Sequence, residues 1–121
     1  MTFGEAVPII KLGPNLLVSL HGDLDDATAL RIEKEITDMV ACTRSTGVLL
    51  DVGGLAVVDT FIARVIARIA GMTRFLGAQS VVVGIQPAVA ITLVELGVRM
   101  QHLNTALNAA EGMALLGRIR S

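Results

Sequence analysis

The stretch that decides the fold is LLDVGGLAVVDTFIARVIA, residues 49–67. It belongs to an apolar run at 48–52 without polar alternation, which is typical of a strand buried on both faces. Two glycines follow, and Asp59 and Thr60 then precede the clearest amphipathic helix of the chain, at 61–76. A buried strand that leads into a helix is the repeating unit of parallel α/β sheets.

Strands and helices alternate on both sides of this unit. Two apolar runs at 7–12 and 15–21 flank Gly13 and Pro14, a turn signal, and predict a β-hairpin. The other predicted elements are a helix at 27–41 capped by the carboxylates of 23–26, a strand at 80–85, a helix at 88–97 with Pro87 at its start, a weak strand at 100–103 and a helix at 108–117. The order β-β-α-β-α-β-α-β-α predicts an α/β fold with a mixed, mostly parallel sheet and the hairpin at its edge. The 121 residues are expected to form a single domain, 1–121.

The composition narrows the classes of function. A net charge of −1 and the absence of Trp and Tyr argue against nucleic acid as a partner. The uncharged run at 75–94 is interrupted by polar residues and Pro87, so we expect no membrane span. Hydrophobic residues make up 53% of the chain and the mean hydropathy is +0.69, which predicts exposed apolar surface and hence self-association or another partner. The single Cys42 is interpreted as a small buried hydrophobe of a cytoplasmic protein.

The sequence holds no recognisable catalytic or metal-binding pattern. His21 and His102 lack metal-ligand spacing with carboxylates or with the cysteine, and no Ser-His-Asp arrangement is evident. We therefore expect no enzyme, no metal and no cofactor. Asp51 is expected at the end of its strand, without the acidic cluster and late lysine of a phosphate-accepting receiver domain. Gly53 and Gly54, interpreted as a turn, leave a weaker hypothesis of a small-ligand-binding or nucleotide-hydrolysing domain.

Asp59 and Thr60 allow two compatible interpretations. Either residue can serve as the N-cap of the following helix, a role that contributes about 1 kcal/mol. The Thr60 hydroxyl can also accept a phosphate, because the free N–H groups and the dipole of a helix N-terminus stabilise an anion. Helical phase places Thr60 opposite an apolar stripe, so we expect it to face solvent or a partner. The stripe consists of Phe61, Val65, Ile69, Met72 and Leu76.

A phosphate on Thr60 is expected to control binding rather than folding. It adds about −1.5 to −2 charges, which the helix end stabilises by about 0.3–1 kcal/mol. A partner carboxylate about 4 Å away would be repelled by roughly 1–4 kcal/mol.

Two arginines follow Thr60 on the same side of the helix. Arg64 and Arg68 lie one turn apart, with Phe75 between them in angle. This side is either a solvated face or an interaction surface on which Arg64 pairs with a phosphate or with a partner's acid. The apolar helix at 88–96, whose only charge is Glu95, is expected to bury part of its surface against another subunit.

Several of these features together resemble a known family. The order of elements, the sequence GDLD at 22–25 before the first helix and the buried strand leading to Asp59 and Thr60 resemble the STAS domain of anti-sigma factor antagonists. The motifs DTFIAR at 59–64 and GIQPAVAITLVELG at 84–97 are similar to the RsbS family, the small STAS-only scaffold proteins of the bacterial stressosome. The resemblance extends from residue 7 to about residue 116.

The resemblance implies a non-enzymatic regulator that assembles in the cytoplasm with a sensory STAS paralogue of the RsbR type. Members of the family sequester a serine/threonine switch kinase of the histidine-kinase-like fold, the RsbT type. The kinase phosphorylates the hydroxyl after the aspartate and is then released, and a PP2C-type phosphatase resets the scaffold. The alternative is a stand-alone STAS anti-anti-sigma factor that binds an anti-sigma kinase without forming a large assembly.

The resemblance also assigns roles to residues. The phosphoacceptor it implies is Thr60, at a position where the scaffold proteins carry serine and where threonine is common in the sensory paralogue. The resemblance carries over Asp59 as the neighbour of the phosphoacceptor. The residues that we predict to lie beside this position or to bind a partner are Asp59, Phe61, Arg64, Arg68, Asp23 and Asp25.

Overall fold

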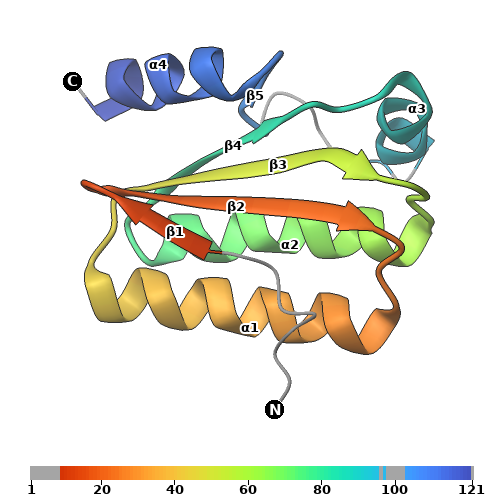
Figure 1. Cartoon of the computed structure of the whole chain (residues 1–121), viewed down its shortest axis with the longest axis horizontal. Coiled ribbons are helices and arrows are strands. Elements are labelled where there is room, and N and C mark those ends of the chain that lie inside the picture. Colours follow the sequence, from red (N-terminus) through yellow and green to blue (C-terminus); the bar gives the residue numbers. More distant parts are fainter. Residues whose placement is uncertain (1–8, 96, 98–102, 121) are drawn as a thin grey trace.

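The computed structural model describes residues 9–95, 97 and 103–120, and its strands form one sheet in the order β1-β2-β3-β4-β5 (Figure 1). β1 (Ile9–Leu12) pairs antiparallel with β2 (Asn15–Gly22). The remaining pairs are parallel and join β2 to β3 (Gly47–Leu55), β3 to β4 (Gln79–Val83) and β4 to β5 (Thr105–Ala106). The predicted α/β fold, with a mixed, mostly parallel sheet and an N-terminal hairpin, is therefore confirmed.

Four helices surround the sheet in the described part of the chain. α1 (Asp26–Thr43) and α2 (Thr60–Phe75) lie side by side on one face, and α4 (Ala109–Arg120) covers the other face (Figure 1). α3 (Pro87–Glu95) lies at the end of the sheet to which β2 and β3 point, and it contacts α2. The loops that start α1 and α2 are at this same end, so the carboxyl edge of the sheet gathers the predicted site residues Asp23, Asp25, Asp59 and Thr60.

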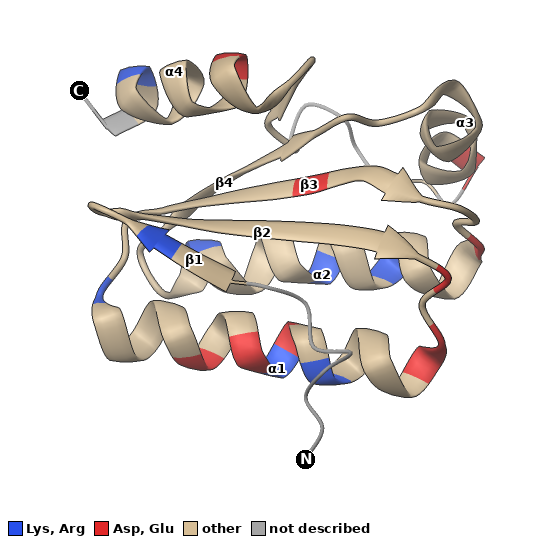
Figure 2. Cartoon of the chain, viewed as in Figure 1, with Lys and Arg blue, Asp and Glu red and all other residues tan. Residues whose placement is uncertain are grey.

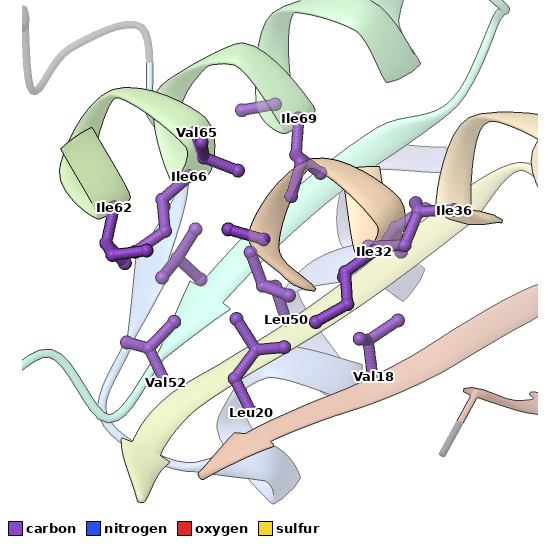
Figure 3. Packing of buried hydrophobic residues seen from close by; sticks show 14 of the residues in the cluster. Val18, Leu20, Ile32, Ile36, Leu50, Val52, Ile62, Val65, Ile66 and Ile69 are labelled. Carbon is purple, nitrogen blue, oxygen red and sulfur yellow. The ribbon is translucent and has the colours of Figure 1, made fainter. Parts of the chain in front are cut away.

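The larger core lies between the sheet and the α1–α2 layer (Figure 3). Alternate residues of a strand point to the same face, which brings Leu50 and Val52 of β3 against the two helices. Ile36 of α1 and Ile66 of α2 are fully buried there. Burial of such a side chain contributes about 1.5–3 kcal/mol, so α2 is held firmly by its inner face. A smaller core beneath α4 contains Leu49, Val81, Val83 and Leu116.

β3 is longer than predicted, and two interpretations based on its end are wrong. The strand continues to Leu55, which places Asp51 in its interior rather than at its end, and Gly53 and Gly54 within it rather than in a turn. The pairing with β2 shifts register between Ser19 and His21, which adds a residue on β3 and keeps the two strands paired. The Asp51 carboxylate accepts a hydrogen bond from the Gly53 N–H at 2.9 Å. That N–H is therefore not available to a phosphate group of a nucleotide.

The buried side of α2 is rotated from the predicted stripe by almost a quarter turn. Val65 and Ile69 are buried as predicted, whereas Phe61 and Met72 are half-buried and Leu76 is exposed beyond the helix end. The prediction counted only large apolar residues, but small residues of α2 also face inward. The buried side chains are Ile62, Ala63, Val65, Ile66, Ile69, Ala70 and Thr73.

Other predictions differ locally from the structure. Cys42 is exposed in the last turn of α1, because the buried side of that helix ends at Val40; its interpretation as a buried residue is wrong. The last described strand is β5 rather than a strand at 100–103; Leu103 is buried but outside any strand, and 100–102 lie outside the described residues. His102 and Leu96 also lie outside them, while β4, α3 and α4 differ from the predictions by a few residues at their ends.

Candidate functional site

Asp59 caps the N-terminus of α2. Its carboxylate accepts a hydrogen bond from the Ile62 N–H at 2.9 Å, and its backbone carbonyl accepts one from the Ala63 N–H at 3.0 Å. Its backbone is extended, with φ −91° and ψ −177°, as expected of an N-cap residue. The capping interpretation of Asp59 is therefore confirmed, and the chain enters the helix at Thr60.

Thr60 is exposed at the first position of α2, as helical phase predicts. The first turn of α2 contains no acidic residue, so the positive end of the helix dipole is offset only by the Asp59 cap. Arg64 lies one turn further along the same side of the helix and is exposed, with no ion pair in the described part of the chain. An anion attached to the Thr60 hydroxyl would therefore meet a helix N-terminus and a free guanidinium group.

Arg68 has a partner within the chain, which changes the role expected for it. Its Nη2 atom lies 3.0 Å from Oε2 of Glu33, whose side chain on α1 is only 5% exposed, while the Arg68 side chain is 58% exposed. The ion pair joins α1 to α2. Sequence reasoning missed Glu33, although its spacing from Ala29 and Ile36 places it on the buried side of α1.

The remaining predicted residues occupy different environments. Asp25 caps α1 as Asp59 caps α2, accepting a hydrogen bond from the Thr28 N–H at 2.7 Å, and this bond lowers the pKa of the Asp25 carboxyl. Asp23 is exposed in the loop between β2 and α1, and this loop lies at the same end of the sheet as the start of α2 (Figure 1). Phe61 is half-buried and packs against the larger core, so only part of its ring faces outward.

Exposed apolar side chains also occur at this edge of the sheet. Val57 precedes the Asp59 cap and is 65% exposed, and Ile91 and Val94 of α3 are 59% and 61% exposed. α3 buries Val89 and Leu93 against the domain and leaves its other side uncovered by the described residues. Exposed aliphatic side chains thus occur at the same edge of the sheet as Thr60, and the exposed Arg64 follows Thr60 along α2.

The structure adds two observations on function classes. Among residues 9–95, 97 and 103–120, no three His, Cys, Asp or Glu side chains are grouped so that they could hold a metal ion. None of the helices described is long and apolar enough to cross a membrane.

Two curated relatives align with most of this chain. RsbRA of Bacillus subtilis, an RsbT co-antagonist protein, is 33% identical over 109 residues, which cover 89% of this chain and 40% of RsbRA. RsbRB of the same organism is 31% identical over 107 residues, covering 88% of this chain and 39% of RsbRB. The chain therefore spans about two fifths of the length of the curated relatives it matches.

Solved structures share the fold and, in part, the sequence. A serine-to-glutamate variant of RsbS from Moorella thermoacetica superposes with a TM-score of 0.86 at 33% identity, covering 94% of this chain and 97% of RsbS. A chain in a solved structure of the stressosome, described as a signal integration and transduction hub, superposes with a TM-score of 0.79 at 30% identity. The match covers 93% of this chain and 98% of the stressosome chain. The anti-sigma factor antagonist SpoIIAA, at 13% identity and a TM-score of 0.70, shares the fold.

A model of the STAS domain matches residues 6–111 of the chain. That span contains the whole of the sheet described here and α1, α2 and α3, together with the Asp59 cap and Thr60. By sequence match and by fold, this chain belongs to the STAS domain family.

Proposed function

We propose that this chain is a phosphorylation-switched regulator of the anti-sigma factor antagonist class that acts as a stressosome scaffold. It holds a serine/threonine switch kinase of the RsbT type and releases it when Thr60 carries a phosphate. The observation that carries the proposal is the exposed Thr60 hydroxyl at the N-terminus of a helix whose charged side chains are all arginines. The likeness to RsbS and to the STAS segments of RsbT co-antagonist proteins supports the choice of partner.

The switch follows from the charges around Thr60. A phosphate gains about 0.3–1 kcal/mol at the helix N-terminus, and Arg64 provides a donor one turn away, so the modified chain stays folded. The same phosphate repels a partner carboxylate about 4 Å away by roughly 1–4 kcal/mol. Because 1.4 kcal/mol is a factor of ten in affinity, one such contact is enough to release a partner of moderate affinity.

The other partners that we propose follow from the family. An RsbR-type sensory paralogue and further copies of this chain would assemble with it in the cytoplasm, and a PP2C-type phosphatase would remove the phosphate. The exposed apolar side of α3 offers one surface for such assembly. In this proposal residues 1–121 act as one non-enzymatic domain.

The phosphorylation site is tested with the switch kinase from the same genome and ATP. We expect the kinase to transfer one phosphate to the chain, and mass spectrometry to locate it on Thr60. Thr60→Ala should abolish the transfer while circular dichroism shows an unchanged fold. Thr28→Ala is the matched control, because Thr28 also lies in the first turn of a helix capped by an aspartate. Phosphate on another residue of the wild-type chain would refute the assignment.

The scaffold proposal is tested separately by light scattering of the chain mixed with its RsbR-type paralogue. A large, defined assembly is the expected result. A complex of only one or two copies would favour the alternative, a stand-alone STAS anti-anti-sigma factor that binds an anti-sigma kinase.

A further inference from the structure

The C-terminal end of α2 exposes an aromatic ring that the fold does not use. Phe75 is 94% exposed, the most exposed large apolar side chain among the described residues. Gly71 lies one turn before it, and the two residues line an open hollow of about 390 Å³ together with Arg74. A nearly bare phenyl ring beside a hollow is typical of a binding surface, because aromatic anchors carry much of the affinity of protein interfaces.

Gly71 has no role in the packing of the described chain. A Cβ atom built at this position would meet no heavy atom within 4 Å, and the residue has an ordinary helical backbone without positive φ. A glycine in a helix interior costs about 1 kcal/mol relative to alanine. The glycine therefore lowers the stability of α2 and leaves a notch beside the Phe75 ring.

The arginines of α2 favour a partner with acidic groups. Three of the ten basic side chains of the protein lie on α2, which carries none of the eleven acidic ones (Figure 2). Arg68 is paired with Glu33 of α1, so the partner has to complement Arg64 and Arg74. A second copy that docked through the same face would bring these arginines against their own counterparts, and such like-charge contacts are unfavourable. The face instead fits a partner with acidic groups for the arginines and an apolar hollow for the ring.

One partner can reach both ends of this face. Thr60, Arg64, Gly71 and Phe75 follow one another along the outer side of α2 at helical spacing. Thr60 and Phe75 are about 22 Å apart at 1.5 Å per residue. A typical protein interface covers about 800 Å² on each partner, enough to include the full length of such a helix.

We propose that Phe75, with the notch at Gly71 and the charge of Arg74, anchors an acidic protein surface that contains an apolar hollow, and that this surface belongs to the partner released by phosphorylation of Thr60. This inference rests on the proposed function, because it takes the switch kinase as that partner. The anchor lies further from Thr60 than the Debye length of about 8 Å at physiological salt. The ring therefore contributes the same factor to the affinity whether or not Thr60 carries a negative charge.

The test compares dissociation constants for the switch kinase from the same genome, measured by titration calorimetry. Phe75→Ala should raise Kd by about 10-fold or more, and Arg74→Glu should raise it by an amount that shrinks at high salt. Leu107→Ala and Arg118→Glu are the matched controls, since Leu107 lies two residues before the start of α4, Arg118 lies on α4, and α4 covers the other face of the sheet (Figure 1). Both controls should bind within about 2-fold of wild type.

A double variant tests the independence of the two ends. The fold-changes in Kd caused by Thr60→Glu and by Phe75→Ala should multiply in the double variant, because the two sites do not touch. If Phe75→Ala and Arg74→Glu bind as wild type while Thr60→Glu still weakens binding, the anchor is refuted and the proposed function stands. If the wild-type chain does not bind the kinase, both are refuted. Binding of the wild-type chain, but not Phe75→Ala, to phosphatidylserine vesicles would show a membrane surface instead and would also overturn the anchor.

Discussion

α1 and α2 lie side by side on the sheet and begin in the same way, yet their outer faces differ. Asp25 and Asp59 cap the two helices with equivalent hydrogen bonds of 2.7 and 2.9 Å. The outer face of α1 carries both signs of charge, including the exposed pair of Lys34 and Asp38, whereas that of α2 carries arginines alone. The cap is thus a structural feature common to both helices, and the charge on the outer face is the difference from which we propose α2 as the docking helix.

The inner faces of α1 and α2 should contribute similar amounts to the unfolding free energy. Ile36→Ala in α1 and Ile66→Ala in α2 each remove a fully buried side chain and should cost about 2–5 kcal/mol of unfolding free energy. Urea denaturation of both variants measures the losses. A loss below about 1 kcal/mol for Ile66→Ala alone would show that α2 is not held as firmly as α1.

Two of the arginines on the outer face of α2, Arg64 and Arg68, should separate into one functional and one structural residue. Arg68→Ala leaves the buried Glu33 carboxylate unpaired and should cost about 1–3 kcal/mol, reduced by the exposure of Arg68. Arg64→Ala should change stability by less than about 0.5 kcal/mol. A double variant, Glu33→Leu with Arg68→Leu, should recover most of the loss. Equal losses for both single arginine variants would contradict the assignment.

The Asp59 cap of α2 should contribute about as much to the unfolding free energy as a typical N-cap. Asp59→Ala should cost about 1 kcal/mol, because the Ile62 N–H loses its acceptor. Asp59→Asn keeps an acceptor in place and serves as the control. Thermal unfolding in which both variants lose the same stability would show that the negative charge, rather than the hydrogen bond, stabilises this end of the helix.

Gly71→Ala should act in the opposite direction and raise the unfolding free energy by about 0.5–1 kcal/mol. The added methyl group enters open space on the outer face, so no contact opposes it. The same variant should weaken kinase binding, because it fills part of the notch beside Phe75. Stabilisation without any loss of binding would separate Gly71 from the docking surface.

The smallest expected effect is on the pH dependence of stability, through the Asp25 cap of α1. The Thr28 N–H lowers the pKa of Asp25 from its ordinary value of 3.8. The stability that this bond supplies is present above the unfolded-state pKa and is lost as the pH falls through the lower folded-state pKa. The melting temperature of the wild-type chain should therefore fall when the pH is lowered from well above this pKa range to well below it. In Asp25→Asn this fall should be smaller. An unchanged fall would show that other carboxylates account for it.

The order of elements was predictable because buried strands appear as uninterrupted apolar runs and helices begin at recognisable caps. The cap at Asp59 and the exposure of Thr60 needed only local geometry. The extent of β3 was not predictable, because glycine is rare in strands and only the pairing of Gly54 with His21 and the close approach of Gly84 to Gly53 explain the two glycines there. The Arg68–Glu33 pair depends on how two helices dock, which neither helix sequence specifies.

The central claim is that a negative charge on Thr60 releases a partner from α2 without unfolding the protein. The most direct measurement is the dissociation constant of the switch kinase for the unphosphorylated chain and for the chain phosphorylated on Thr60, at equal ionic strength. We expect the phosphorylated form to bind at least about 10-fold more weakly, with an unchanged circular dichroism spectrum. Equal affinity of the two forms would contradict the account.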